Sequence, residues 1–474
     1  MKQLKYVLVG ALMLGINAPV MAQEDNKTVI ESITKVIKSN SSDAEEQVKA
    51  VFKKNKKNPE VLVGIARAYF EQKDTAKARV FADFANKAAK YKCAQAYVLL
   101  GDISAMGEDG GTAAQHYQQA ISFDPKNPEP YYKYANVYRK VSPTVAVMKL
   151  DELRKQRPDV AVDALAGRIY YMSNEFDKAI TSYKKADISK MEERDITEYA
   201  MALYFKQRNQ ESLEVVQYGL KKKPRDAAFN RLAFFNSTDL KNYDQALLYA
   251  DALFNKSDSA KFSYFDYTYY GNALNGAKKY DEAIDMFKKA LEQEFDSKDK
   301  KAGVIKTLSD AYSSQEKYED AIKYYEEYLN TYSTPTATDY AGLPQLYYYK
   351  ASKEQGDAMK ASLKKSDELY GQLAEKYQDA IEYATFWRAR VNNAMDNEQK
   401  EALAKPYYEK LIEVYSTRTE LNNSDKARLK ESYLYLISYY ARVVDDMTKA
   451  KECATKLLEI DPENETAKVV LGVK

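Results

Sequence analysis

The sequence predicts an all-α protein made of stacked helix pairs, and three observations lead to this fold class. Glycine and proline number 16 and 12 among 474 residues, about half of their average combined share of roughly 12%, so few residues interrupt helices. The same residue classes return at intervals of roughly 34 residues, as they do in helical repeat arrays. The chain is also too long for one compact core, since single cores stop growing at about 250 to 300 residues. An array of repeats satisfies all three observations.

The clearest copy of the repeat lies in the middle of the chain. It contains large, small and aromatic residues in a fixed order: Tyr267, Tyr270, Gly271, Leu274, Tyr280, Ala283, Phe287 and Ala290. The following copy keeps the order of these classes: Ile305, Leu308, Ser309, Tyr312, Tyr318, Ala321, Tyr325 and Tyr328. Such a recurrence is typical of a repeated helix-turn-helix, in which small residues let the helix backbones approach and aromatic residues fill the space between pairs.

This pattern resembles the tetratricopeptide repeat. The copy over residues 94–127 matches that family well, through Tyr97, Leu100, Gly101, Ala113, Tyr117, Ala120 and Pro125, and residues 431–464 match it too. The resemblance implies a right-handed superhelical solenoid of tetratricopeptide helix-turn-helix repeats. It also implies a protein of the interaction class, because the family presents a concave groove lined by the first helix of each pair.

Residues 1–22 have the features of a cleaved secretory signal and take no part in the predicted fold. Lys2 and Lys5 precede an apolar run, and small residues lie one and three places before a cleavage point after Ala22. The apolar run is shorter than the roughly 20 residues that cross a bilayer. We therefore expect cleavage after Ala22, export across the inner membrane to the periplasm, and no membrane-spanning segment afterwards.

The remaining chain divides by the quality of the repeats. We expect a degenerate helical pair that acts as an N-terminal cap over 23–58, and a repeat array over 59–330. Polar turn-forming residues then predict a linker or hinge at 331–340. Divergent repeats follow over 341–474, with longer helical hairpins at 356–377 and 386–415, one strong repeat and a capping helix. This organisation amounts to about eleven helix pairs.

Charge and cysteine content exclude several classes of protein. The formal net charge is +2, and removal of Lys2 and Lys5 with the signal brings it to zero. An overall attraction to nucleic acid therefore has no support. The two cysteines, Cys93 and Cys453, lie in repeats at opposite ends of the array, where they are expected to be small packed residues and not a disulfide.

Motifs for catalysis, metals and cofactors are absent from the sequence. The single histidine, His116, has no cysteine or carboxylate at metal-ligand spacing. No phosphate-binding loop, nucleophile elbow, zinc signature or calcium loop occurs. Acidic pairs such as Glu192-Glu193 are expected by chance among 70 acidic residues. We therefore expect no enzymatic activity, no cofactor and no catalytic residues.

The resemblance also implies which side chains face the groove, because the second, fifth, ninth and twelfth positions of each first helix line it. These positions hold Tyr132, Asn136, Arg139, Arg168, Tyr171, Thr197, Tyr204, Arg231, Phe235, Phe265, Thr268, Asn272, Asn275, Tyr435, Tyr439 and Arg442. Aromatic, amide and guanidinium groups together suit an extended peptide, and they would equally suit a sugar polymer. The Lys and Asn clamp of cytoplasmic relatives is not reproduced, because Tyr132 and Thr268 stand where its lysine would be.

These expectations combine into one functional hypothesis. The chain is expected to be an exported, non-catalytic scaffold that binds a protein or peptide partner in the bacterial periplasm or cell envelope. The alternative is a cell-envelope module that binds a glycan on the aromatic groove residues.

Overall fold

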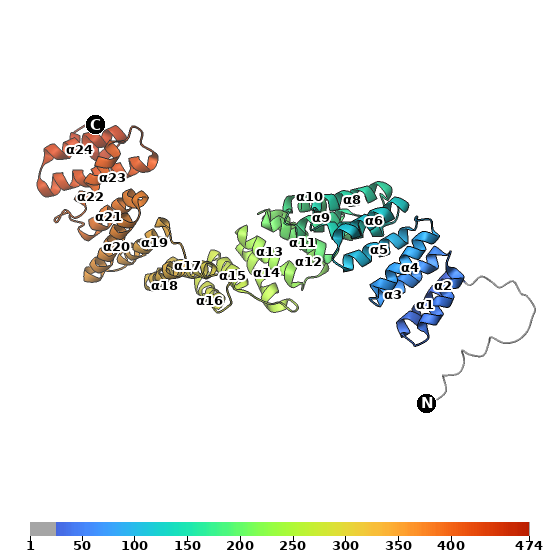
Figure 1. Ribbon diagram of the computed structural model, residues 1–474. Coiled ribbons are helices and arrows are strands. Elements are labelled where there is room, and N and C mark those ends of the chain that lie inside the picture. The colour runs from blue at the N-terminus through green and yellow to red at the C-terminus, as the bar shows by residue number, and fades with distance from the viewer. Residues whose placement is uncertain (1–24, 474) are drawn as a thin grey trace, which may run out of the picture. The chain divides into compact units, whose positions relative to one another are not determined.

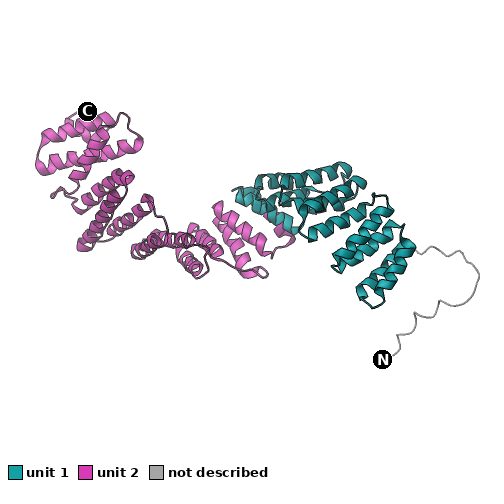
Figure 2. Cartoon of the chain, viewed as in Figure 1, with its two compact units in different colours: residues 1–215 teal, residues 216–474 magenta. Residues whose placement is uncertain are grey.

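The structure is a computed structural model that describes residues 25–473. Within this range it contains 25 α-helices and no strand (Figure 1), so the predicted all-α array of helix pairs is confirmed. The predicted signal sequence, residues 1–22, lies outside the described residues. Contacts divide the chain into two compact units, residues 1–215 and 216–474 (Figure 2), and each is described by itself.

Unit 1 is a series of antiparallel helix pairs in chain order. Its helices are α1 (Asn26–Ser39), α2 (Ala44–Asn55), α3 (Pro59–Glu71), α4 (Thr75–Ala88), α5 (Ala94–Met106), α6 (Gly110–Phe123), α7 (Pro128–Tyr138), α8 (Pro143–Gln156), α9 (Asp163–Met172), α10 (Phe176–Lys185) and α11 (Glu193–Phe205). Helix α12 (Asn209–Lys222) runs across the division between the units. In the five pairs from α1 to α10 the two helices pack on each other, and the second helix of each pair also packs on the first helix of the next pair.

Unit 2 continues the same plan. Its helices are α13 (Ala227–Asp239), α14 (Tyr243–Asp251), α15 (Tyr264–Gly276), α16 (Tyr280–Leu291), α17 (Lys298–Ser314), α18 (Tyr318–Thr331), α19 (Ala337–Ala351), α20 (Gly356–Lys376), α21 (Ile381–Met395), α22 (Lys405–Ser416), α23 (Asn423–Tyr439), α24 (Met447–Ile460) and α25 (Glu465–Leu471). A short 3-10 helix, η3 (Gln378–Ala380), precedes α21, and a π-helical segment, η4 (Tyr440–Val444), follows α23.

Four first helices begin with the same device, a capping box whose third helical residue is an aspartate. In each, the carboxylate accepts a hydrogen bond from the backbone N–H of the N-cap residue, and the N-cap side chain accepts one in return. We call these residues the capping aspartates: Asp195 of α11, Asp266 of α15, Asp339 of α19 and Asp425 of α23. The carboxylates stabilise the helix starts, where the backbone N–H groups would otherwise lack partners.

The core of each unit lies between neighbouring helix pairs, where small residues allow close approach. Alanines at the predicted small positions are fully buried, which confirms their stacking role: Ala113, Ala120, Ala246, Ala283, Ala321 and Ala450. Gly271 of α15 serves the same purpose, because a Cβ atom there would lie only 2.4 Å from Cε1 of the buried Phe287 ring.

A pair of glycine substitutions tests this packing. Gly271→Ala is expected to lower the free energy of unfolding by about 1 to 3 kcal/mol, because the Phe287 ring has no room to move. Gly303 of α17 is the control, since a Cβ there meets nothing within 4 Å, so Gly303→Ala should stabilise the helix by about 0.5 to 1 kcal/mol. Thermal unfolding of both variants checks the signs, and shifts in the same direction would contradict the assignment.

The segment around 331–340 differs from the sequence expectation in part. The chain leaves helix after Thr331 and re-enters it at Ala337, as the polar residues predicted. However, α18 and α19 share one hydrophobic cluster, in which Tyr328 lies with Leu343 and Leu346. The boundary between compact units falls instead at 215/216. The two helices on either side of 332–336 thus belong to one continuous stack.

The prediction of a helical hairpin over 356–377 is wrong. Residues 356–376 form the single long helix α20, which pairs with α19, so the described chain holds twelve pairs and a final helix. Helix α19 was not predicted, because Pro344 lies in its interior and a proline there removes a backbone donor and usually interrupts a helix. The carbonyl of Pro344 accepts a 2.8 Å hydrogen bond from the buried Ser366 hydroxyl of α20, which ties the two helices together.

Cys93 and Cys453 are both free and partly buried, as expected, and burial raises the pKa of the Cys453 thiol to about 11. Among the described residues, none of the helices combines the length and the apolar character that a bilayer-spanning segment requires.

Candidate functional site

The residues predicted to line the groove lie on first helices in both units, but two of them are buried. Phe235 of α13 is only 5% exposed and packs with its ring centroid 4.2 Å from that of Tyr269. Tyr435 of α23 is 6% exposed and lies 4.7 Å from Tyr408 by the same measure. Both side chains belong to the core, so their assignment as ligand contacts is corrected.

Other members of the list keep solvent access. Phe265 is 41% exposed, and Asn136 and Arg442 are exposed too. The remaining members are partly buried: Tyr132, Arg139, Arg168, Tyr171, Thr197, Tyr204, Arg231, Thr268, Asn272, Asn275 and Tyr439. Exposure alone does not make a binding site, so the polar contacts of the arginines decide how they are used.

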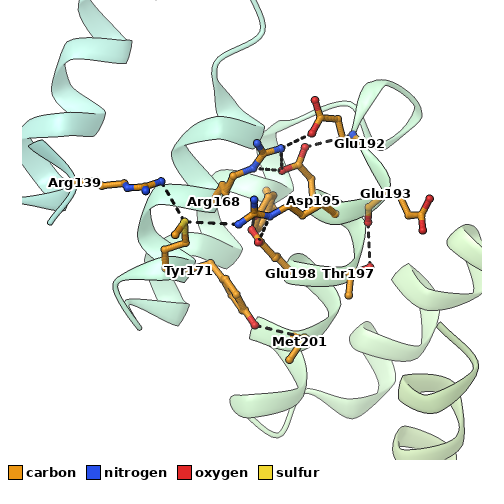
Figure 3. A network of polar contacts seen from close by, with 12 residues as sticks. Arg139, Arg168, Tyr171, Glu192, Glu193, Asp195, Thr197, Glu198 and Met201 are labelled. Atoms are coloured by element: carbon orange, nitrogen blue, oxygen red, sulfur yellow. Dashed lines mark hydrogen bonds and ion pairs between the residues drawn. The ribbon is translucent and has the colours of Figure 1, made fainter. Parts of the chain in front are cut away.

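Arg168 of α9 is held by ion pairs within unit 1. Its Nε and Nη2 atoms donate to Oδ1 of the capping aspartate Asp195 at 3.0 and 2.8 Å, and Nη2 also donates to Glu192 at 2.7 Å (Figure 3). The Asp195 side chain is 4% exposed, and a carboxylate so placed needs a cationic partner. Arg168 therefore joins two repeats.

The same network contains weaker contacts of other predicted groove residues. Arg139 Nη1 lies 3.4 Å from the sulfur of Met172, and the Tyr171 hydroxyl donates to the sulfur of Met201 at 3.4 Å (Figure 3). Thioether sulfur is only a weak acceptor. Unlike Arg168, these two side chains are not fixed by strong internal bonds.

Unit 2 repeats the arrangement of Arg168 and Asp195. Arg231 Nε donates to Oδ1 of the capping aspartate Asp266 at 2.6 Å, and its Nη2 donates to the carbonyl of Lys261 at 2.6 Å. Arg418 Nη1 lies 2.8 Å from Oδ2 of Asp425, which is also buried. Thus Arg168 and Arg231, both predicted to contact a ligand, instead neutralise buried carboxylates of the next repeat.

Asp339 is the capping aspartate without an arginine. Its Oδ1 accepts a hydrogen bond from the neutral Tyr328 hydroxyl, and its Oδ2 accepts from the backbone and hydroxyl of Thr336 at 2.8 and 2.7 Å. Burial acts to raise the pKa of Asp339, but these hydrogen bonds and the charge of Lys306 outweigh it and lower the pKa. The preceding first helix, α17, contains no arginine, and Lys306 is the cation of that helix whose charge acts on this carboxylate.

A cavity of about 620 Å³ opens beside Asp339. It lies within unit 2 and is lined by residues of α17, α19 and the segment from η3 to α21, together with Tyr325 of α18 and Leu373 of α20. Its polar lining includes Lys306, Asp310, Ser313, Gln345 and Asp379, and its aromatic lining is Tyr325, Tyr349 and Tyr383. The size falls within the range of about 300 to 1,000 Å³ that is usual for ligand sites.

Asp310 and Lys306 are accessible from this cavity. Lys306 Nζ lies 3.6 Å from Asp310 Oδ2, and the Asp310 side chain is 57% exposed. Burial nevertheless raises the pKa of Asp310. The charge of Lys306 and its hydrogen bond oppose this rise without cancelling it, so the charge of Asp310 is only partly compensated.

The aromatic residues of the cavity differ in how firmly they are held. The Tyr325 hydroxyl donates to the Asp339 carbonyl at 2.9 Å, so this ring is part of the wall. Tyr349 is 38% exposed and accepts a hydrogen bond from the Gln345 amide at 3.0 Å. Tyr383 is partly buried, and burial raises the pKa of its hydroxyl, while hydrogen bonds to Trp387 and Tyr370 act in the opposite direction. The cavity thus offers donors, acceptors and flat apolar faces.

Sequence reasoning missed this site, although part of its signal was present. The second, fifth, ninth and twelfth positions of the repeat that contains Ile305 are Gly303, Lys306, Asp310 and Ser313. The predicted groove residues did not include any from this repeat. Gln345 and Tyr349 belong to α19, which was not predicted because proline usually interrupts a helix and Pro344 lies within it. Asp379 and Tyr383 follow residues 356–376, which were predicted as a hairpin but form the single helix α20.

No group of three or more histidine, cysteine, aspartate or glutamate side chains in residues 25–473 is placed to hold a metal ion. His116 is partly buried, its ring centroid lies 6.2 Å from that of Tyr97, and burial lowers its pKa.

Comparisons with known proteins identify the repeats. The family model described as "Tetratricopeptide repeat" matches residues 266–334, and the model described as "TPR repeat" matches residues 111–141. No curated protein matches the chain.

Several solved structures are similar to the chain. The C-terminal part of a TPR repeat-containing protein from Cytophaga hutchinsonii is 27% identical, with 58% of this chain and 99% of that chain covered and a TM-score of 0.46. A tetratricopeptide repeat protein from Parabacteroides merdae is 18% identical, with 53% and 98% covered and a TM-score of 0.33. YrrB, described as a TPR protein with an unusual peptide-binding site, is 15% identical, with 51% and 97% covered and a TM-score of 0.26.

Proposed function

Because this chain is a tetratricopeptide repeat protein, we propose that it is an exported, non-catalytic scaffold that binds an extended segment of a partner protein in the cavity between α17, α19 and α21. The observation that carries the proposal is the cavity itself, which has a volume of about 620 Å³ and is lined by charged, amide and aromatic side chains. The first helices of three successive pairs line it, on the face that the family uses for its groove.

The chemistry of the lining suits a peptide. An extended segment presents backbone N–H and C=O groups. The Asp310 carboxylate can accept hydrogen bonds from the N–H groups, and the Gln345 amide can donate to the C=O groups. Tyrosine supplies a large contact area with little conformational entropy to lose, and the exposed Tyr349 and the partly buried Tyr383 lie at the site. Many such contacts along a groove sum to a specific interaction.

The sequence supports the remaining parts of the proposal. Residues 1–22 have the charge, apolar run and small residues of a secretory signal, which supports the proposal that the scaffold is exported to the periplasm or cell envelope. The absence of catalytic and cofactor motifs from the sequence, together with a single histidine, supports a role in binding without catalysis.

A cavity-filling substitution tests the proposed site. Ala341 lines the cavity, so Ala341→Trp should fill it with an indole and weaken peptide binding at least about tenfold, because a ligand would have to displace the ring. The purified chain is applied to an array of random-sequence octapeptides, and dissociation constants are measured for the peptides that it retains. Circular dichroism checks that the helices are intact.

The control places the same indole outside the cavity. Glu327 is an exposed residue of α18 that does not line the cavity, and Glu327→Trp should leave binding unchanged. Equal affinity of the wild type and Ala341→Trp would show that the cavity is not the site. Retention of the chain on insoluble polysaccharide, with no peptide retained, would support the glycan-binding alternative instead.

A further inference from the structure

The cavity lies where the stack lacks one of its recurring ion pairs. Asp195, Asp266 and Asp425 are each neutralised by an arginine guanidinium. At Asp339 the corresponding contact comes from the uncharged Tyr328 hydroxyl. An arginine at this point would occupy space beside Asp339, and here the structure has a cavity instead.

The charged side chains that line the cavity carry more negative than positive charge. Three carboxylates, those of Asp310, Asp339 and Asp379, face one ammonium group, that of Lys306. Lys306 approaches Asp310 only to 3.6 Å, whereas Arg168 reaches Asp195 at 2.8 Å. The cavity is therefore complementary to a positive charge.

We infer that the segment bound in this cavity presents an arginine or lysine side chain, whose cationic group lies between Asp310 and Asp339 and supplies the charge that an arginine of the chain supplies at the other capping aspartates. This inference rests on the proposed function. The side-chain stem lies against the faces of Tyr349 and Tyr383, which attract a cation through their ring electrons. Arginine fits better than lysine, because its planar group can stack on tyrosine and bond a carboxylate at once.

The pKa of Asp310 agrees with this arrangement. Burial raises it in the chain alone, which indicates a carboxylate short of favourable partners. A cation bound at hydrogen-bond distance would stabilise the ionised form and lower the pKa again.

Lys306 has a defined part in the inference. It occupies the cavity with the same charge as the expected ligand group, so it competes for Asp310. Lys306→Gln keeps a polar side chain of similar length and removes that competition. It should tighten the binding of an arginine peptide by about two- to fivefold, as for the loss of one competing exposed ion pair. A general loss of binding in this variant would contradict the inferred role.

The test uses the octapeptides that the wild-type chain retains. Each is resynthesised with its basic residue changed to glutamine or to glutamate, and affinities are measured by fluorescence anisotropy. Replacing arginine by glutamine should weaken binding about tenfold or more, the usual effect of losing one charged hydrogen bond. Asp310→Asn should abolish this preference, and Glu327→Gln, which removes the same charge outside the cavity, should retain it.

The outcomes separate this inference from the proposed function. If neutral or acidic peptides bind the wild type as tightly as basic ones, or if Asp310→Asn keeps the preference for arginine, the cationic ligand is wrong while peptide binding stands. If no octapeptide is retained at all, the proposed function fails, and the inference fails with it.

Discussion

Arg168→Ala is expected to lower the free energy of unfolding of unit 1 by about 3 kcal/mol, the effect of removing one partner from a buried ion pair. Arg168 makes two hydrogen bonds to Asp195 and one to Glu192. Without the guanidinium, the buried Asp195 carboxylate keeps only the cap contact from the backbone N–H of Glu192. The loss is therefore dominated by an uncompensated charge and not by lost packing.

Chemical denaturation measures this effect, and a second arginine is its control. Arg139 was also predicted to face the groove, but its guanidinium makes a weak contact with the Met172 sulfur and no ion pair is described for it. Arg139→Ala should therefore change the free energy of unfolding by less than about 0.5 kcal/mol. In an Asp195→Asn background, Arg168→Ala should cost much less than in the wild type, because no buried charge remains. Equal losses in both backgrounds would show that the ion pair is not the cause.

Phe235→Ala is expected to destabilise unit 2 by about 3 to 5 kcal/mol, the usual range for deleting a buried phenylalanine ring. Phe235 is 5% exposed and contacts the rings of Phe234, Phe265 and Tyr269. The substitution leaves a cavity in the middle of this aromatic cluster. The main effect of a smaller residue at this position should therefore be on the stability of unit 2 and not on ligand binding.

Phe265 provides the matched comparison for Phe235. Its ring belongs to the same cluster but is 41% exposed, so part of its surface already faces water. Phe265→Ala should cost about 1 kcal/mol, near the average for single substitutions. Thermal unfolding distinguishes the two, and a larger shift for Phe265→Ala than for Phe235→Ala would reverse the assignment of core and surface.

The helices and their stacking could be predicted because stacking residues recur. Ala283, Ala321 and Gly271 were chosen from their class and spacing alone, and each lies at a close contact between helices. Such positions obey one geometric requirement in every repeat, so any single copy is supported by the others. Helix α19 is the exception, because Pro344 and the polar residues before it carry a helix-breaking signal that its packing against α18 overrides.

The candidate site was harder to predict, because the use of a side chain depends on partners in another repeat. Arg168 and Arg231 have the chemistry and the position of ligand contacts, and their buried aspartates lie about one repeat away. The sequence shows an aspartate near the start of four first helices, but it does not indicate which cation neutralises each one. The feature that distinguishes the cavity, an aspartate without its arginine, emerges only when the four capping aspartates are compared in space.

Site-specific crosslinking tests most directly whether partners bind in the cavity. A photoreactive phenylalanine analogue replaces Tyr349, an exposed aromatic residue that lines the cavity, or Glu327, on the exposed face of α18, in cells that express the full chain. A discrete crosslinked product is expected from position 349 and none from position 327. Crosslinking from position 327 alone, or at equal yield from both positions, would contradict this expectation.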